Sequence, residues 1–525
     1  MRSTFSGLEV AKRALFSQQT ALQTTGHNIA NANTKGYTRQ IVNLTASRPL
    51  EAPGLMRSNT PGQLGQGVEF DSIKRIREGF LDQQFYHENK NLGSWTVRKD
   101  ALEKLESILN EPSETGVRQV IENFWNAWQV VSKEPENATA RAALKESAIA
   151  LSDGFNHTSK QFQDLAGDLT ENITVKLNEA NQMLTQVARL NQEIFRVEGL
   201  GNSANDLRDQ RDLLADDLSK ILGVTVREAP GGYDISLGGA ALVTGIEVNT
   251  VLTPADMEAM YQSGQLDSGE VHGMIYSRDE YVASYQFQLD SMVKVLVEGE
   301  VEVTLPQGTV VPKGTVINGV PYNGDVASRT LGSDTKVKVK GINGLHALGY
   351  TLDDPPKSGV PFFTMKDGYT TWSAASLQLN PDIKNKVSNI ATSGRVIEEG
   401  GVEKVVKGNN IIALELAGLR NKRFDFEPSP TGTPILTNGS FDEFYRAMVG
   451  QLGVQAQEAN RQQVNQKALV DQVEGRRQSV SGVSLDEEMA NLIKYQHAYN
   501  AAARAMTSND EILDKVINGM GVVGR

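Results

Sequence analysis

The chain has 525 residues, more than a single hydrophobic core usually supports, so its length predicts two to four domains. It contains no cysteine, which excludes disulfide frameworks, thiolate metal sites and cysteine nucleophiles. The net charge is −12, and Lys and Arg are interleaved with Asp and Glu, so the chain lacks the basic footprint that a nucleic-acid partner requires.

The sequence has no run of about 18 apolar residues, and we therefore expect no membrane insertion. Near the N-terminus, Glu9, Lys12 and Arg13 interrupt any apolar stretch of the kind that a cleaved signal peptide needs. If the protein is exported, another route must recognise it.

Both ends of the chain carry a seven-residue apolar repeat. The positions at the N-terminal end are Leu8, Leu15, Leu22 and Ile29, and those at the C-terminal end are Leu485, Leu492, Tyr499, Met506 and Leu513. Met489 lies four residues after Leu485 and extends the C-terminal stripe. Such a repeat keeps an apolar stripe facing one partner, as in a coiled coil, so each end predicts a long amphipathic helix. On periodicity alone, ordinary bundle helices explain the pattern equally well. Stripes at both ends favour antiparallel pairing of the two termini, and we expect these positions to form the subunit interface.

Between the ends, the predicted secondary structure changes several times along the chain. Residues 34–73 contain many Gly and Pro and predict an extended arm. Helical patterns follow at about 75–109, 114–132, 137–197, 205–222 and 277–297, with Asn137 and Thr139 as candidate N-caps. Val224–Arg227 and Tyr233–Leu237 predict a hairpin, and period-two alternation with Asn318-Gly319 and Asn323-Gly324 predicts an inserted β subdomain. We expect β and irregular structure to continue to about residue 427, and helix from Phe441 to the end with a break near 479–484.

These elements predict an α+β multidomain protein, with terminal coiled-coil helices and an elongated α-helical bundle around nested β-rich structure. The expected terminal coiled-coil domain comprises residues 1–36 and 482–525. The helical-bundle domain with its extended arm comprises 37–225 and 437–481. A mixed β-rich outer region covers 226–436 and includes the inserted subdomain at 298–340.

No constellation of residues predicts catalysis, a cofactor or a metal. The six histidines form no His-Glu-x-x-His pair, and Gly62, Gly65 and Gly67 lack the dinucleotide spacing. His346, beside Asn343-Gly344, is better explained as a turn or packing residue than as a general base. Asp206, Asp209, Asp212, Asp216 and Asp217 are interpreted as a solvated helix face with local ion pairs. Asp486, Glu487 and Glu488 follow Ser484, where carboxylates complement a helix dipole and Ser caps it.

The segment Gly26–Tyr37 resembles the N-terminal signature of flagellar rod, hook and hook-associated proteins, through Asn28, Asn31, Asn33, Gly36 and Tyr37. Segment Arg476–Gln496 resembles, more narrowly, the hook-associated protein 1 family. The patches Asn343–Tyr350, Pro361–Phe363 and Phe441–Tyr445 agree with it, and the likeness is weakest at 298–340. From the residues themselves, the Asn side chains compete for backbone hydrogen bonds and Gly36 can adopt positive φ, so the signature predicts the end of the first helix.

The resemblance implies a structural subunit at the distal end of the hook, forming the hook–filament junction on which the filament is built. Its implied partners are like subunits in a ring, the hook protein, the second junction protein and an export chaperone. The implied location is the extracellular flagellum, without a cleaved signal peptide. We also expect the termini to order only on assembly. The alternatives are another hook or distal-rod axial protein, or a secreted adhesin or enzyme that shares axial termini.

Overall fold

The computed structural model describes residues 5–48, 65–109, 116–428 and 436–519. The chain forms two compact units. Unit 1 comprises Met1–Ser94, Thr174–His272 and Val464–Arg525, and unit 2 comprises Trp95–Ile173 and Gly273–Gln463. Helices α2 (Gly79–Leu109), α4 (Ala138–Glu198) and α12 (Phe441–Ser481) contribute residues to both units.

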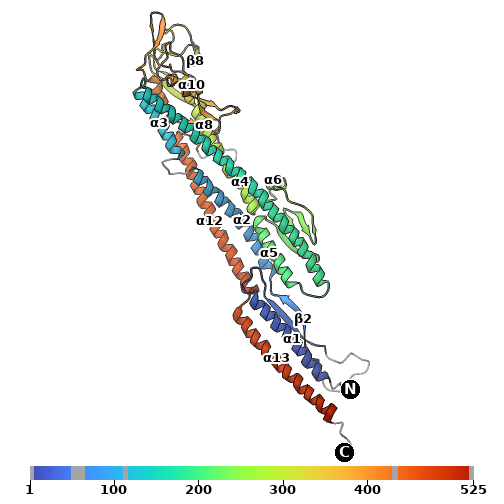
Figure 1. The fold of residues 1–525 in the computed structure, drawn as a ribbon. Helices are drawn as coiled ribbons and strands as arrows, with labels where there is room; N and C mark the ends of the chain where they lie inside the picture. The colour runs from blue at the N-terminus through green and yellow to red at the C-terminus, as the bar shows by residue number, and fades with distance from the viewer. Residues whose placement is uncertain (1–4, 49–64, 110–115, 429–435, 520–525) are drawn as a thin grey trace, which may run out of the picture. The chain divides into compact units, whose positions relative to one another are not determined.

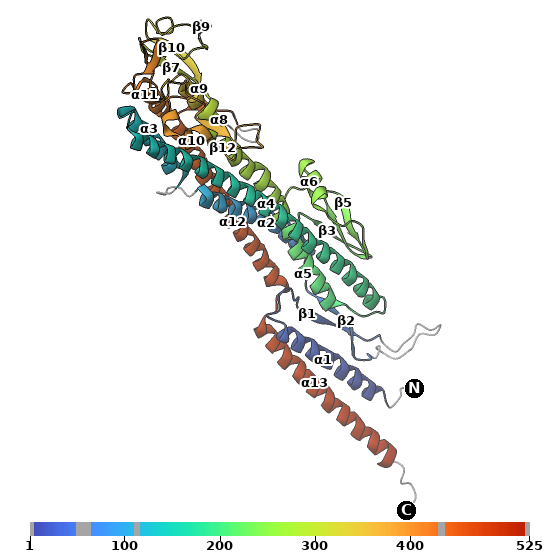
Figure 2. The same cartoon turned by 45° about the horizontal axis from the view of Figure 1, so that its top comes forward.

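In unit 1, the two terminal helices α1 (Ser6–Ala30) and α13 (Leu485–Asp514) lie side by side (Figure 1, Figure 2). They run antiparallel, because Gly7 lies against Asn509 while Asn28 contacts Glu488 at the other end of the pair. The predicted amphipathic helix at each end and their antiparallel pairing are confirmed. The helices approach closely: a Cβ atom on Gly7 would lie 2.6 Å from Asn509 Oδ1.

The predicted extended arm begins and ends in a two-stranded antiparallel sheet. Strands β1 (Gln40–Ala46) and β2 (Val68–Arg75) pair from Gln40 with Arg75 to Ala46 with Val68, with a bulge at Asn43/Leu44. The sheet packs on α1. Because Arg75 ends β2, helix α2 begins at Gly79 and not near 75 as predicted. The part of the arm at 49–64 lies outside the described residues.

Unit 1 also holds α5 (Asn205–Ile221) and a four-stranded antiparallel sheet. The sheet contains β3 (Thr225–Ala229), β4 (Gly232–Leu237), β5 (Ala240–Thr244) and β6 (Glu247–Val248), in that order. The predicted β3–β4 hairpin is confirmed, and β5 and β6 were not anticipated. Helix α6 (Pro254–Gln262) begins with a capping box between Thr253 and Asp256.

The core of unit 2 is aromatic and belongs to α3 (Val117–Lys133), the start of α4 and the segments that pack on them. Phe124 and Trp128 contact Phe362, and Trp125 contacts Phe441. Asn137 caps α4 as predicted, since its Oδ1 accepts hydrogen bonds from the backbone N–H groups of Thr139 and Ala140. The helix predicted at 277–297 is a π-helical turn (Ser277–Val282) followed by α8 (Ala283–Glu298), after the short α7 (Glu270–Tyr276).

The insertion at 298–340 forms two strand pairs. Strands β7 (Glu300–Leu305) and β10 (Thr335–Lys340) pair antiparallel, with Val301, Val303 and Leu305 buried. The β8 (Thr315–Ile317) to β9 (Val320–Tyr322) hairpin turns at Asn318 (φ 49°) and Gly319 (φ 82°), as predicted. Asn323-Gly324 does not join two strands; it lies in a turn after β9.

The insertion is built into unit 2. Buried Arg329 donates hydrogen bonds to the Val311 carbonyl and the Tyr350 hydroxyl, and it forms an ion pair with Glu403. Residues 341–427 are less β-rich than predicted, because three short helices interrupt them. The helices are α9 (Gly341–Ala347), α10 (Pro381–Asn385) and α11 (Ile411–Gly418). The strand pairs are β11 (Phe363–Met365) with β12 (Leu377–Leu379), β13 (Val396–Glu399) with β14 (Val402–Val405), and β15 (Phe424–Asp425) with β16 (Asn438–Gly439).

The α+β multidomain class is confirmed. The break between α12 and α13, at 482–484, lies inside the predicted interval. The division into three domains with the boundaries given above stays a prediction.

Candidate functional site

Asn28, in the last turns of α1, is the centre of a buried polar joint. Its Nδ2 donates hydrogen bonds to the Gln40 carbonyl (2.9 Å) and to Glu488 Oε2 (3.0 Å). Its Oδ1 accepts from the Tyr37 hydroxyl (2.8 Å) and the Gln40 backbone N–H (3.0 Å). The side chain thus uses its full hydrogen-bonding capacity to connect α1, the start of β1 and α13.

Arg39 holds the first turn of α13 from the other side. Its guanidinium donates to Glu488 at 2.9 Å and to Glu487 at 2.7 Å, and its backbone N–H donates to the Ser481 carbonyl. Ser484 caps α13 as predicted, because its hydroxyl accepts from the Glu487 N–H. From the sequence, Glu487 and Glu488 were interpreted as carboxylates that complement the helix dipole, and their ion pairs with Arg39 were not predicted. Buried Glu488 accepts hydrogen bonds from both Asn28 and Arg39.

The remaining signature residues shape the turn that leaves α1. Gly36 has φ +82°, as predicted, and a Cβ atom there would lie 3.2 Å from Leu213 Cβ. The helix itself ends earlier, at Ala30, where Asn31 Nδ2 donates to the His27 carbonyl. Burial and the carboxylates of Asp206, Asp209 and Glu488 raise the pKa of Tyr37, so its phenol stays protonated and donates to Asn28. Asn33 is exposed and does not enter the joint.

The predicted seam positions do not all lie between α1 and α13. Leu8, Leu15, Leu22 and Ile29 are half-buried, as are Leu492, Tyr499 and Met506, while Leu513 is buried. Leu485 and Met489 are 49% and 50% exposed. The α13 stripe that meets α1 also includes Glu488 and Asn509, which share one heptad position with buried Ala502. An outward stripe of Leu485, Met489 and Ile493, spaced by four residues, is left on the surface. Whether the seam positions contact neighbouring subunits stays a prediction.

The acidic face of α5 is a buried charge cluster, and its interpretation as a solvated face was wrong for three of the five residues. Asp209, Asp212 and Asp216 are buried, and their partners come from distant segments. Arg75 contacts Asp209 at 2.6 Å and Asp212 at 2.8 Å, and Arg77 binds Asp82 and Asp212. The spacing i, i+3, i+7 of the three aspartates marks one face of a helix and was the signal for burial.

Arg477, near the end of α12, completes this cluster. It donates to both carboxylate oxygens of Asp216 (3.2 and 2.8 Å) and stacks 4.4 Å from the centre of the Phe85 ring. Burial raises the pKa of Asp216 to about 6, against the opposing effect of Arg477. Burial also raises the pKa of Asp212, but Arg77 and Arg75 outweigh it and hold that pKa below the ordinary value. The cluster ties α12, α2 and α5 together beside the joint.

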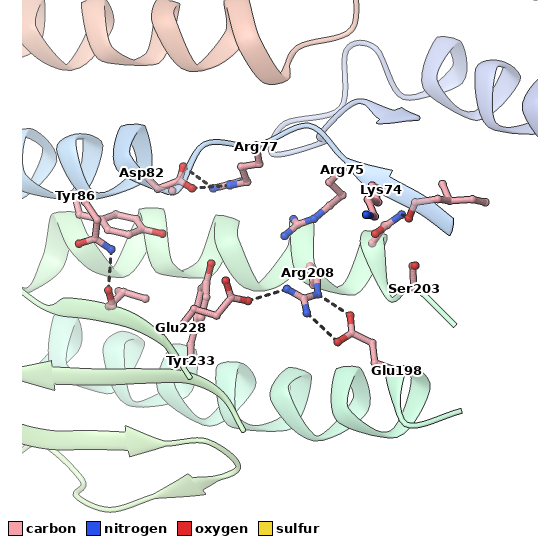
Figure 3. A pocket seen from close by; sticks show the side chains of 15 residues that line it. Lys74, Arg75, Arg77, Asp82, Tyr86, Glu198, Ser203, Arg208, Glu228 and Tyr233 are labelled. Carbon is pink, nitrogen blue, oxygen red and sulfur yellow. Dashed lines mark hydrogen bonds and ion pairs between the residues drawn. The ribbon is translucent and has the colours of Figure 1, made fainter. Parts of the chain in front are cut away.

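A polar hollow of about 430 Å³ opens next to this cluster (Figure 3). It lies among the end of β2, the start of α2, α5 and β3. Arg208 spans it, donating to Glu198 (2.7 and 2.8 Å) and to Glu228 (2.7 Å). Lys74, Arg75 and Tyr86 also line it. No local sequence pattern predicts this hollow, because its lining residues come from three separate stretches of the chain, 73–86, 198–208 and 226–233.

His346 has the packing role predicted for it. The ring is fully buried in unit 2, donates from Nδ1 to the Val360 carbonyl (2.5 Å) and accepts at Nε2 from the Ala391 N–H (2.8 Å). Burial lowers its pKa to about 4, so it is neutral at pH 7. Within the described ranges, no three His, Asp or Glu side chains are grouped so that they could hold a metal ion. In the part of the chain that the structure describes, no helix is both long and apolar enough to cross a bilayer.

Comparison with known families gives three matches along the chain. Residues 102–301 match the family described as flagellar hook-associated protein FlgK helical domain. Residues 476–519 match the flagellar basal body rod FlgEFG protein C-terminal family, and residues 8–38 match the flagella basal body rod protein family. The two rod-type matches contain Asn28 and Tyr37 on one side of the joint and Glu488 on the other.

Comparison with individual proteins extends over the full length. The chain is 34% identical to flagellar hook-associated protein 1 of Bacillus subtilis (strain 168), over 100% of both chains. It is 24% identical to flagellar hook-associated protein 1 of Escherichia coli (strain K12), over 97% of this chain and 98% of the relative. A solved structure of the flagellar hook junction protein FlgK from Burkholderia pseudomallei aligns with a TM-score of 0.47 and 15% identity, covering 77% of this chain and 100% of that one.

Proposed function

The chain belongs to the flagellar hook-associated protein 1 family and is a structural protein of the flagellar hook–filament junction, and we propose that the Asn28 joint fixes the form in which its terminal helices assemble. The observation that carries this proposal is the complete hydrogen bonding of Asn28 to three segments. A joint without spare hydrogen-bonding capacity holds α13 in one direction relative to the β1–β2 sheet. Assembly requires such a fixed direction, because every copy must present the same surface.

The surface that the joint presents is the outward stripe of Leu485, Met489 and Ile493. These side chains are about half exposed, although the chain buries comparable residues elsewhere. Exposed apolar stripes on helices serve association. We propose that this stripe, with the half-buried seam positions, contacts neighbouring subunits in a ring at the distal end of the hook.

As a member of an axial family, the protein assembles with itself and with other flagellar proteins. The specific partners that we propose are the hook protein on one side and the second junction protein on the other. We also propose an export chaperone that covers the apolar stripe of α13 before assembly, and delivery to the extracellular flagellum without a cleaved signal peptide. In this scheme the protein works by assembly, without enzyme chemistry.

The test is the state of the flagella in a strain that lacks the gene. We expect hooks without filaments and abundant flagellin in the medium, and restoration by the wild-type gene. The Asn28→Ala gene is expected to restore filaments poorly, and the Asn33→Ala gene to restore them fully. Normal filaments on the deletion strain would overturn the junction role.

A further inference from the structure

The rim of the polar hollow in unit 1 combines one unpaired cation with exposed apolar side chains. Among the described residues, the Lys74 ammonium makes no hydrogen bond or ion pair, although Lys74 lines the hollow. Phe80 and Leu200 are 76% and 79% exposed; Phe80 follows the lining residue Gly79, and Leu200 lies in the turn between the lining residues Glu198 and Ser203. Large apolar side chains this exposed beside a concave surface indicate an interaction site.

The other charges of the hollow are already used. Arg75 is paired with Asp209 and Asp212, Arg77 with Asp82 and Asp212, and Arg208 with Glu198 and Glu228. The hydroxyl of buried Tyr86 has no hydrogen-bond partner, so the hollow also contains an unsatisfied hydrogen-bonding group. What the rim lacks is therefore one carboxylate, flanked by apolar side chains that cover Phe80 and Leu200.

The first turns of α13 have this composition. Glu487 and Glu488 are bound by Arg39, but the Asp486 carboxylate has no hydrogen bond or ion pair among the described residues. It is exposed and stands beside Leu485 and Met489, which are a helical turn apart on the outward stripe. The unpaired carboxylate and its apolar flanks match the unpaired ammonium and its apolar rim.

We propose that in the assembled junction the hollow of one copy receives the first turn of α13 of the neighbouring copy, with an ion pair between Lys74 and Asp486. This inference rests on the proposed function. The two residues are not paired within one chain, since Arg39 and Asn28 hold the turn and Arg75 holds the strand that carries Lys74. Each copy would insert its α13 turn into the hollow of one neighbour and accept the α13 turn of another in its own hollow. Such a head-to-tail contact closes into a ring when the rotation between copies is right.

The absence of cysteine from the chain allows a direct test. Two differently tagged genes, one carrying Lys74→Cys and the other Asp486→Cys, are expressed together in the deletion strain, and isolated flagella are treated with a short bismaleimide that links two thiols, because an ammonium–carboxylate pair leaves the Cα atoms too far apart for a direct disulfide. We expect a crosslinked dimer that carries both tags. The matched control replaces Lys74→Cys with Lys467→Cys, an exposed lysine of α12 in the same unit, and is expected to give no dimer. If both tagged chains are present in the flagella and no mixed dimer forms, the contact is wrong.

Charge reversal gives a second test that needs no cysteine. Lys74→Glu and Asp486→Lys are each expected to lower incorporation into flagella about fivefold or more, and the double reversal is expected to restore it. A double variant no better than the single ones overturns the ion pair. A photo-crosslinker at position 74 that captures the hook protein, and not a second copy, overturns the choice of partner. Filaments on the deletion strain itself would instead overturn the junction role, so the two failures are distinguishable.

Discussion

Asn28 and Glu488 share a hydrogen bond of 3.0 Å although 460 positions separate them in the chain. The bond closes the two ends of the sequence into one structural element, because it joins the last turns of α1 to the first turn of α13. Arg39 balances the Glu488 carboxylate, and Tyr37 and Gln40 occupy the remaining capacity of Asn28. The N-terminal signature around Asn28 is thus held in place by Glu488, a residue of the C-terminal helix.

Replacing Asn28 with Ala is expected to destabilise unit 1 by about 2–4 kcal/mol, because it leaves the Gln40 N–H, the Tyr37 hydroxyl and Glu488 without their buried partner. Hydrogen exchange of residues 20–30 and 485–495 in the assembled protein, in which the termini are expected to be ordered, measures the loss. The exposed Asn33→Ala is the control and is expected to change stability by less than about 0.5 kcal/mol. Equal protection in both variants would show that the joint is not a stabilising element.

Replacing Arg477 with Met is expected to cost about 3–5 kcal/mol, because it leaves Asp216 buried without a partner. Hydrogen exchange of residues 471–481, at the end of α12, should report the loosening. Arg476, its exposed neighbour, provides the control: Arg476→Met should leave this segment protected.

The same pair allows a suppressor experiment. Adding Asp216→Asn to Arg477→Met removes the unpaired charge, and most of the lost protection is expected to return. If the double variant is as poorly protected as Arg477→Met alone, Arg477 acts through its other contacts, the Phe85 ring and the carboxylates of Asp82 and Glu474, and not through Asp216.

The sequence predicted helices and strands well where the periodicity was strong, and it failed where segments meet. The terminal helices, the Asn137 cap and the Asn318-Gly319 turn each depend on residues close together in the sequence, so a local pattern is enough to predict them. The charge cluster is not local: Arg75 ends β2 and Arg77 follows it, while Asp209 and Asp212 lie on α5. The aspartates also alternate with Arg208 and Arg211, which imitates an exposed face.

The contacts of the candidate site also join segments that are distant in the sequence. Asn28 was identified through a resemblance, but its partners could not be derived, because Glu488 already had a sufficient local explanation at a helix start. The seam positions were chosen by hydrophobicity, whereas the stripe that meets α1 contains Glu488 and Asn509, which no apolar repeat selects. The short helices α9, α10 and α11 were missed, since each is shorter than the window in which helical periodicity is visible.

Gly93→Ala is expected to destabilise unit 1 by about 1–3 kcal/mol, although Ala is the better helix former. A Cβ atom at Gly93, inside α2, would lie 2.2 Å from the Lys220 carbonyl oxygen at the end of α5, so the two helices would have to separate. Gly167→Ala, in α4, is the control, because no atom lies within 4 Å of its added Cβ. It should stabilise the protein by about 0.5–1 kcal/mol. Urea unfolding followed by far-ultraviolet circular dichroism measures both, and a stabilised Gly93→Ala would show that the helices do not meet at this glycine.

Unit 2 is expected to lose about 2 kcal/mol of stability between pH 7 and pH 5 through His346. Burial lowers the pKa of His346 from 6.5 to about 4, so the unfolded chain binds the proton first as the pH falls. The stabilisation is therefore complete above pH 6.5 and is lost as the pH falls towards 4. Unfolding followed by tryptophan fluorescence isolates this unit, because Trp95, Trp125, Trp128 and Trp372 all belong to it.

The control for this effect is His346→Gln, which removes the titrating ring. The variant is expected to be less stable at pH 7, because Gln cannot reproduce both hydrogen bonds, but to lack the His346 part of the pH dependence. The comparison is needed because other groups titrate in the same unit: burial raises the pKa of Asp290, which favours the folded state as the pH falls. The decisive quantity is thus the difference between the two proteins in their change from pH 7 to pH 5. A difference near zero would mean that His346 is protonated in the folded unit, and that the Ala391 N–H has found another acceptor.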